Sequence, residues 1–299
     1  MQPEVVLVVV TYNSARDVPD LLDCVPAALA GVHGAVIVVD NGSQDETVAV
    51  LRARGDCQVV EAENRGYAAG INRGVAAGPP APAILVLNPD VRLQPGSVPE
   101  MLRALALPRV GVVAPKILEV DGSVSRSLRR EPTLGRASGL GFTRLPAFSE
   151  YVTAAVAYQR AHPVDWALGA VLLLRRECYD ELGGWDESFF LYSEETDFCL
   201  RARDRGWLTR FEPSAVAVHI GGGSGQSDRT HVMQIVNRVR FYVRRRGSVR
   251  GWLYWAATIA SEATWLARGH RQSRAAIRAL LAPRSRPPEL GCSEHVLPR

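Results

Sequence analysis

The sequence is poor in several residue types, and each shortage narrows the possible functions. It contains one lysine, Lys116, and five scattered cysteines that form neither a C-x-x-C pair nor another metal-ligand spacing. No uncharged apolar stretch of about 18 residues occurs, so we expect no membrane-spanning helix. The N-terminus lacks a basic segment and a small-residue cleavage site, so we also expect no signal peptide. Free thiols in a reducing, cytoplasmic setting are the expected state of the cysteines.

Composition indicates an ordinary folded protein with one unusual segment. Apolar residues make up 47% and charged residues 22% of the 299 residues. Between Arg238 and Pro287 there are 12 arginines and one acid, Glu262, so the net charge of +4 divides into +11 for this arm and −7 for the rest. A basic arm predicts an anionic partner. We expect no nucleic acid, because reader motifs and an interleaved aromatic platform are missing.

In the first half, short β-branched runs alternate with amphipathic segments. The predicted strands are Val5–Val10, Ala35–Asp40, Cys57–Ala62 and Ala83–Asn88, and the predicted helices are Asp17–Ala30, Asp45–Arg54 and Gly70–Ala77. This alternation predicts a mostly parallel, Rossmann-like sheet flanked by helices. Ligands bind at the carboxyl ends of such strands. The segments expected to line one cleft there are Thr11–Ser14, Asp40–Asp45, Asn64–Gly70 and Asn88–Asp90.

The second half is less regular. Residues Gly122–Ser149 are rich in Ser, Arg, Gly and Pro, which is typical of a loop or lid. The elements expected after it are a strand within Val164–Arg175, a helix over Cys178–Gly183, a helix over Glu194–Arg205 and a strand over Ala215–Ile220. From about Met233 the chain is expected to be helical and basic.

Two strand ends carry residues that can bind a divalent cation. In LNPDV, Asn88 and Asp90 follow a buried strand, although Asn-Pro-Asp is also a common turn. In AVHIGGGS, His219 ends a strand before a glycine turn, where a histidine is either a metal ligand or a structural hydrogen-bonding group.

Two further segments can bind a nucleotide. In VVDNGSQDET, helix capping alone explains the turn and Asp45, and the functional alternative is that Asp40 accepts the imide N–H of a uracil or thymine ring. The segment NRGYAAGINRG, Asn64–Gly74, has three glycines that permit close approach of a diphosphate or ribose, but it is neither a P-loop nor a dinucleotide fingerprint.

The most acidic segment is Trp185–Trp207, where Glu194, Glu195 and Asp197 stand among aromatic residues. A carboxylate at the mouth of an aromatic pocket can have a raised pKa and act as a general base. An acidic first helical turn explains the same residues without any catalytic role.

Together these motifs resemble the family-two inverting glycosyltransferases of the GT-A fold, especially the rhamnosyltransferase-like branch, over roughly Val5 to Gly247. VVVTYN is similar to the first-strand motif that surrounds the nucleobase, and VVDNGSQDET to the second base-binding segment. LNPDV occupies the place of the family's D-x-D metal motif with Asn88 in place of the first acid. FFLYSEETDFCLR resembles the helix start that carries the catalytic base.

The resemblance implies a role for each candidate residue. The nucleotide-sugar site would comprise Thr11, Tyr12, Asn13, Asp40, Asn41, Gly42, Asn64, Gly66, Gly70, Asn72, Asn88 and Asp90. Asp90 and His219 would hold Mg²⁺ or Mn²⁺. Glu195 would be the general base, with Glu194 as the alternative. The acceptor side would comprise Trp166, Gly169 and Trp185, although core packing also explains the tryptophans.

The implied function is transfer of a sugar, L-rhamnose from dTDP-rhamnose, to a polyprenyl-diphosphate-linked saccharide in cell-envelope synthesis. Residues 1–232 would form the catalytic domain, with a nucleotide-sugar-binding half over 1–120 and an acceptor half over 121–232. Residues 233–299 would form the helical arm. Its tryptophans and its stripe of Arg268, Arg271, Arg274 and Arg278 fit either an anionic membrane surface or a hairpin packed on the body.

These assignments place the protein in the cytoplasm, peripherally on the inner face of the plasma membrane. A UDP-linked donor, a soluble acceptor and a homodimer are left open. So is a non-catalytic module that binds nucleotide sugars.

Overall fold

The first half of the chain folds as the alternating pattern predicts. The computed structural model describes residues 2–143, 145–221 and 227–290. Strands β1 (Val5–Thr11), β2 (Gly34–Asp40), β3 (Gln58–Glu61) and β4 (Ala83–Leu87) pair in parallel, in the order β3-β2-β1-β4. Helices α1 (Val18–Leu29), α2 (Thr47–Arg54) and α3 (Tyr67–Ala77) connect them. Helix α3 starts three residues earlier than expected, so Gly70 lies inside the helix.

The rest of the sheet is mixed. Strand β10 (Val171–Arg175) runs antiparallel between β4 and β6 (Val110–Leu118). Strand β11 (Leu208–His219) is parallel to β6 and also pairs antiparallel with β5 (Val91–Leu93) and β8 (His162–Val164). The strand expected within Val164–Arg175 is therefore divided among β8, β9 (Trp166–Ala167) and β10.

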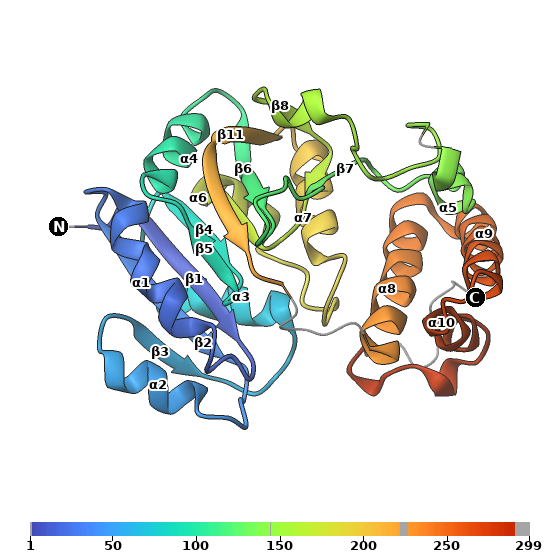
Figure 1. Cartoon of the computed structure of the whole chain (residues 1–299), viewed down its shortest axis with the longest axis horizontal. Coiled ribbons are helices and arrows are strands. Elements are labelled where there is room, and N and C mark those ends of the chain that lie inside the picture. The colour runs from blue at the N-terminus through green and yellow to red at the C-terminus, as the bar shows by residue number, and fades with distance from the viewer. Residues whose placement is uncertain (1, 144, 222–226, 291–299) are drawn as a thin grey trace.

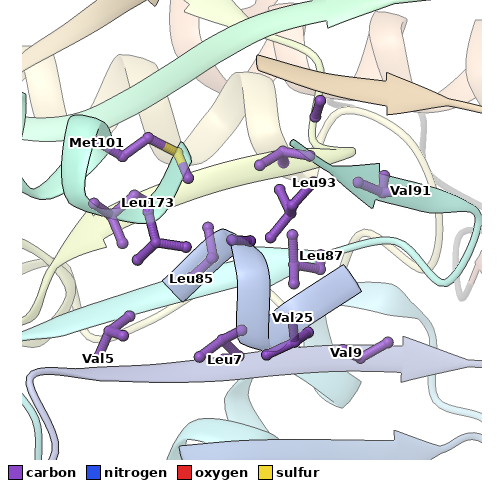
Figure 2. Packing of buried hydrophobic residues seen from close by; sticks show 14 of the residues in the cluster. Val5, Leu7, Val9, Val25, Leu85, Leu87, Val91, Leu93, Met101 and Leu173 are labelled. Carbon is purple, nitrogen blue, oxygen red and sulfur yellow. The ribbon is translucent and has the colours of Figure 1, made fainter. Parts of the chain in front are cut away.

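Helices cover both faces of the sheet because alternate residues of a strand point to opposite sides. On one face, Val5, Leu7 and Val9 of β1 belong to a core cluster with residues of α1 and α4 (Ser97–Leu105); in Figure 2, Val25 of α1 lies by β1 and Met101 of α4 lies by Leu173 of β10. The other residues of β1 pack against α3 in a second cluster. Each fully buried aliphatic side chain stabilises the fold by roughly 1.5–3 kcal/mol. This two-sided core holds the carboxyl ends of β1 and β4 in place.

The segment expected to be a loop contains short elements. They are β7 (Leu128–Arg129), which pairs with β9, helix α5 (Leu134–Ala137) and a 3₁₀ turn over Leu140–Thr143. A further 3₁₀ turn covers Ala155–Tyr158. Helix α5 lies beside the C-terminal helices in Figure 1, and Gly139 directly contacts Ser261 there. This segment therefore connects the body with the C-terminal part.

Before β11, two helices shape the remaining wall of the body. Helix α6 (Arg176–Leu182) ends at Gly183, whose φ of 71° places it in the left-handed region favoured by glycine. Helix α7 (Glu194–Asp204) begins at the first of the acidic residues that the sequence singles out. The helices expected over Cys178–Gly183 and Glu194–Arg205 are thereby confirmed.

Three helices, α8 (Asp228–Arg246), α9 (Ser248–Ala267) and α10 (Gln272–Leu281), pack around their own core (Figure 1). Short 3₁₀ turns over Pro283–Ser285 and Pro288–Leu290 follow. The boundary predicted between residues 232 and 233 falls inside α8, and residues 291–299 of the predicted extension lie outside the described residues. No helix among the described residues has the length and apolar character needed to span a membrane.

Arginines of α8 attach this helix to the body. Arg245 pairs with Asp204 at 2.6 Å and with Glu131 at 3.1 Å, while Arg244 pairs with Asp186 at 3.1 Å. Arg246 also reaches Glu131. Acids of the body thus neutralise the part of the predicted basic arm that lies in α8, as the packed-hairpin alternative requires for this helix.

Candidate active site

A cavity of about 1600 Å³ opens at the carboxyl ends of the parallel strands and extends to α8 and α9. The predicted site residues that line it are Thr11, Tyr12, Asn13, Asn41, Asn64, Gly66, Asn88, Asp90, Trp166, Gly169, Glu194, Glu195 and His219. Asp40, Gly42, Gly70, Asn72 and Trp185 are not among the residues that line it. Segments widely separated in sequence therefore share one cleft.

Asp90 and His219 meet because β5 and β11 are neighbours. His219 is the last residue of β11 and pairs in register with Val91, the residue after Asp90. The Asp90 Oδ1 and His219 Nε2 atoms are 3.2 Å apart, and this hydrogen bond raises the pKa of His219. A carboxylate oxygen and an imidazole nitrogen facing one cleft suit a divalent cation. Among the described residues no third His, Cys, Asp or Glu joins them. Residues Gly222–Ser224, at the end of the AVHIGGGS segment, lie outside the described residues.

The end of β1 presents an aromatic ring to the cleft. The N–H of Asn13 donates to Ser43 Oγ at 2.8 Å, and Asn13 Oδ1 accepts from the N–H of Gln44 at 2.7 Å. Asn13 itself has a φ of 52°, which asparagine tolerates better than most residues. These bonds fix the turn after β1, and the adjacent Tyr12 is 52% exposed. An exposed ring at this position can stack on a planar base.

Asp40 lies behind that turn. Its carboxylate accepts hydrogen bonds from the Thr11 hydroxyl at 3.0 Å and the Ser43 N–H at 2.9 Å, and it is 2% exposed. Both oxygens therefore already have protein donors. The predicted contact between Asp40 and a pyrimidine stays a prediction.

The acidic residues of α7 are the most unusual titratable groups in the cleft. Glu194 is 4% exposed and Glu195 is half-buried, and in each the Oε2 atom is buried without a hydrogen-bond partner. Burial raises the pKa of both carboxyls, and for Glu194 the charge of Glu195 raises it further. The preceding Tyr192 and Ser193 both have positive φ, 68° and 75°. Such backbone strain often accompanies functional sites.

Tyr67 is a residue of the cleft that the sequence analysis does not select. Its hydroxyl donates to Gly169 O at 3.3 Å. Burial and the nearby carboxylates of Glu194, Glu195 and Asp90 together raise its pKa well above the usual value. Tyr67 is therefore close enough to the predicted base and to Asp90 to be influenced by their charges. The feature of the sequence that points to Tyr67 is its position inside the glycine-rich segment Asn64–Gly74, where α3 starts.

Gly66 allows α3 to approach the loop before α7. A Cβ atom at Gly66, whose φ is 97°, would lie 2.3 Å from Phe190 O. The adjacent N–H of Tyr67 donates to that same oxygen at 2.8 Å. Glycine is thus required by the contact between two protein segments.

The predicted site residues outside the cavity support its walls. Gly70 packs against Val10, where an added Cβ would lie 2.7 Å from Val10 Cγ1. Asn72 exchanges two hydrogen bonds of 2.9 Å with the backbone of Trp185, and the Trp185 ring stacks on Phe198 with centroids 4.8 Å apart. Gly42 has a φ of 74° in the turn that contains Asp40. The core-packing alternative for Trp185 fits this arrangement.

Comparison with known proteins gives consistent matches. The family model for glycosyl transferase family 2 matches residues 6–162. The chain is 33% identical over 254 residues to the N-acetylglucosaminyl-diphospho-decaprenol L-rhamnosyltransferase of Mycobacterium tuberculosis, covering 79% of this chain and 80% of that one. It is 30% identical over 211 residues to a low-salt glycan biosynthesis hexosyltransferase of Haloferax volcanii, covering 68% of this chain and 62% of that one.

Among solved structures, the chain is similar to a mannosyltransferase from Pyrobaculum calidifontis in complex with GDP-Man and Mn²⁺. The TM-score is 0.58 at 18% identity, covering 98% of this chain and 84% of that one. At this identity the likeness concerns the fold.

Proposed function

The chain belongs to glycosyl transferase family 2 and has the GT-A fold, and from this membership we propose an inverting, metal-dependent transfer of a sugar from a nucleoside diphosphate. The observation that carries the proposal is that Glu195, Asp90 and His219 line one cavity. The mycobacterial relative supports L-rhamnose as the sugar and a polyprenyl-diphosphate-linked N-acetylglucosamine as the acceptor.

In this proposal each group has one task. Mg²⁺ or Mn²⁺, held by Asp90 and His219, would supply positive charge that stabilises the leaving diphosphate. Glu195 would accept the proton of the attacking acceptor hydroxyl at its carboxylate, whose raised pKa makes it a stronger base. Tyr12 would stack on the nucleobase, and Asp40 would favour thymine or uracil over a purine. Residues 1–232 would act as the catalytic domain, with donor and acceptor halves meeting near residue 120.

We also propose that the protein works peripherally at the cytoplasmic face of the membrane. On α9, Val249, Trp252 and Leu253 are large apolar residues exposed to solvent, and Trp252 is 50% exposed. Two exposed arginines lie at the ends of this helix, Arg250 near its start and Arg268 directly after its last residue. Aromatic and basic residues together are typical of proteins that lie on anionic bilayers.

The test is an assay of diphosphate release and sugar transfer with a panel of nucleoside diphosphate sugars and a lipid-linked N-acetylglucosamine. We expect transfer with dTDP-rhamnose, retention of activity with Mn²⁺ or Mg²⁺, and its loss with a chelator. Asp90→Ala should abolish turnover and weaken metal-dependent binding of the nucleoside diphosphate. Full activity in the presence of the chelator would contradict the metal proposal.

A further inference from the structure

Five arginines line the cavity, and they fall into two groups. Arg238 and Arg229 pair with Glu150 and Glu289. The other three are Arg126, Arg129 and Arg136. Within the part of the chain that the structure describes, none of these three has a carboxylate within 4.0 Å. All three belong to the segment around β7 and α5, so the cavity contains a local excess of positive charge.

Arg129 places this charge on the acceptor side. Its guanidinium carbon lies 3.9 Å from the Tyr151 ring centroid and 5.9 Å from that of Trp166. The charge of Arg129 also acts on Glu195, whose pKa is raised by burial and partly lowered again by this arginine. The Gly169 backbone packs against the side chain of Glu195. A Cβ atom added at Gly169 would lie 3.4 Å from Glu195 Cβ. The cation therefore stands beside the predicted base and the predicted acceptor residues.

Aromatic residues line the same cavity as these cations. Phe142, Phe148 and Trp265 line it, and Phe142 is 65% exposed. The Arg268 guanidinium carbon lies 5.6 Å from the Phe142 ring centroid and 5.5 Å from that of Trp265. An anionic group attached to a long apolar chain would match a cavity lined by both cationic and aromatic side chains.

We propose that Arg126, Arg129 and Arg136 bind the diphosphate of a lipid-linked acceptor, while its apolar chain leaves past Phe142 and Trp265. This inference rests on the proposed function. A diphosphate could also come from the donor, but that group is assigned to the Asp90–His219 pair. Of the three arginines, Arg129 instead lies near Trp166 and acts on Glu195.

The test compares two acceptors that carry the same sugar, one on a polyprenyl diphosphate and one on a neutral alkyl chain. The variants are Arg129→Gln and the double variant Arg126→Gln with Arg136→Gln. Arg160→Gln is the control, because Arg160 is exposed and does not line the cavity. Rates are measured on the alkaline plateau, so that a change in the pKa of Glu195 does not intervene.

We expect KM for the diphosphate acceptor to rise about tenfold or more in both variants, which corresponds to about 1.4 kcal/mol. The kcat/KM for the neutral acceptor and KM for the donor should stay unchanged. Equal losses with both acceptors would overturn the proposal, and a rise confined to the donor KM would assign the arginines to the donor. If the wild-type enzyme transfers to neither acceptor, the proposed function itself fails.

Discussion

At the scale of single residues, Glu194 and Glu195 are adjacent but have different surroundings. Glu194 is almost fully buried, whereas Glu195 is half-buried, packs against Gly169 and is influenced by Arg129. An acceptor hydroxyl entering the cavity can reach a partly exposed residue more readily than a buried one. This difference favours Glu195 as the base.

Glu195→Gln is therefore expected to lower kcat by about two to four orders of magnitude, because the amide cannot accept a proton. Binding of the nucleoside diphosphate, followed by calorimetry, should barely change. Glu194→Gln is the matched variant and should retain more activity. If Glu194→Gln is the inactive variant instead, the base is assigned to the wrong residue.

The raised pKa of Glu195 predicts a particular pH dependence. The base works when ionised, so the rate should fall as the pH drops through the raised pKa, and this acid limb should lie above the ordinary glutamate value of about 4.3. Arg129→Gln should move the limb to still higher pH, because a nearby cation favours the ionised carboxylate. Profiles of kcat/KM for wild type, Arg129→Gln and Arg160→Gln would measure this. An acid limb that is the same in all three would contradict the assignment.

Asp90 and His219 could be predicted to meet because both follow strands whose ends lie on the same side of the sheet. Tyr67 belongs to a segment expected to line the cleft, but its closeness to three carboxylates of distant segments could not be predicted from the sequence. Likewise, no sequence pattern shows that both oxygens of Asp40 are already hydrogen-bonded.

At the scale of elements, the parallel strands were predictable and the inserted ones were not. Strands β1 to β4 are short β-branched runs separated by helical patterns, which indicates parallel strands joined by helical crossovers, although their order in the sheet, β3-β2-β1-β4, differs from their order in the chain. Strand β5 has three residues, too few for a period to be recognised. Strand β10 is an apolar run, but nothing in that run shows that it pairs antiparallel with β4 and β6, which lie far from it in the sequence.

The contact between α3 and the loop before α7 gives an element-scale prediction. Gly66→Ala would place a Cβ against Phe190 O in a left-handed backbone conformation, so we expect a loss of about 2–4 kcal/mol in unfolding free energy. Because Tyr67 would be displaced, kcat should fall as well.

Gly55→Ala is the matched control for this variant. Gly55 also has a positive φ, 71°, but an added Cβ would meet nothing within 4 Å. We expect a loss of about 1 kcal/mol and unchanged kcat. Denaturant unfolding and steady-state kinetics of both variants measure the difference, and equal effects would show that the Phe190 contact is unimportant.

At the scale of the whole molecule, the basic arm has two parts. Arginines of α8 pair with acids of the body. Within the arm, the exposed arginines that have no salt bridge among the described residues are Arg250, Arg268, Arg271, Arg274, Arg278 and Arg284. The remaining positive charge is thus concentrated on the C-terminal helices, and each such arginine contributes about 1 kcal/mol near an anionic bilayer.

This division decides how membrane binding should be tested. Deleting the chain from Gly251 onward would expose the core that Tyr254 and Ala276 share with α8. The truncated protein would therefore lose stability as well as positive charge. Substitutions of exposed residues avoid that effect. Trp252 and Leu253 are 50% and 55% exposed on α9, next to Arg250.

We expect Trp252→Ser combined with Leu253→Ser to weaken binding to anionic vesicles and to slow transfer to a lipid-linked acceptor, because interfacial apolar area is lost. Diphosphate release from the donor should be unchanged. Leu107→Ser, at an exposed leucine of the body, is the control. Salt should release the wild-type protein from the vesicles, since exposed charges are screened beyond about 8–10 Å at physiological ionic strength. If the double variant sediments with vesicles and glycosylates the lipid acceptor as well as the wild type, α9 is not the membrane contact.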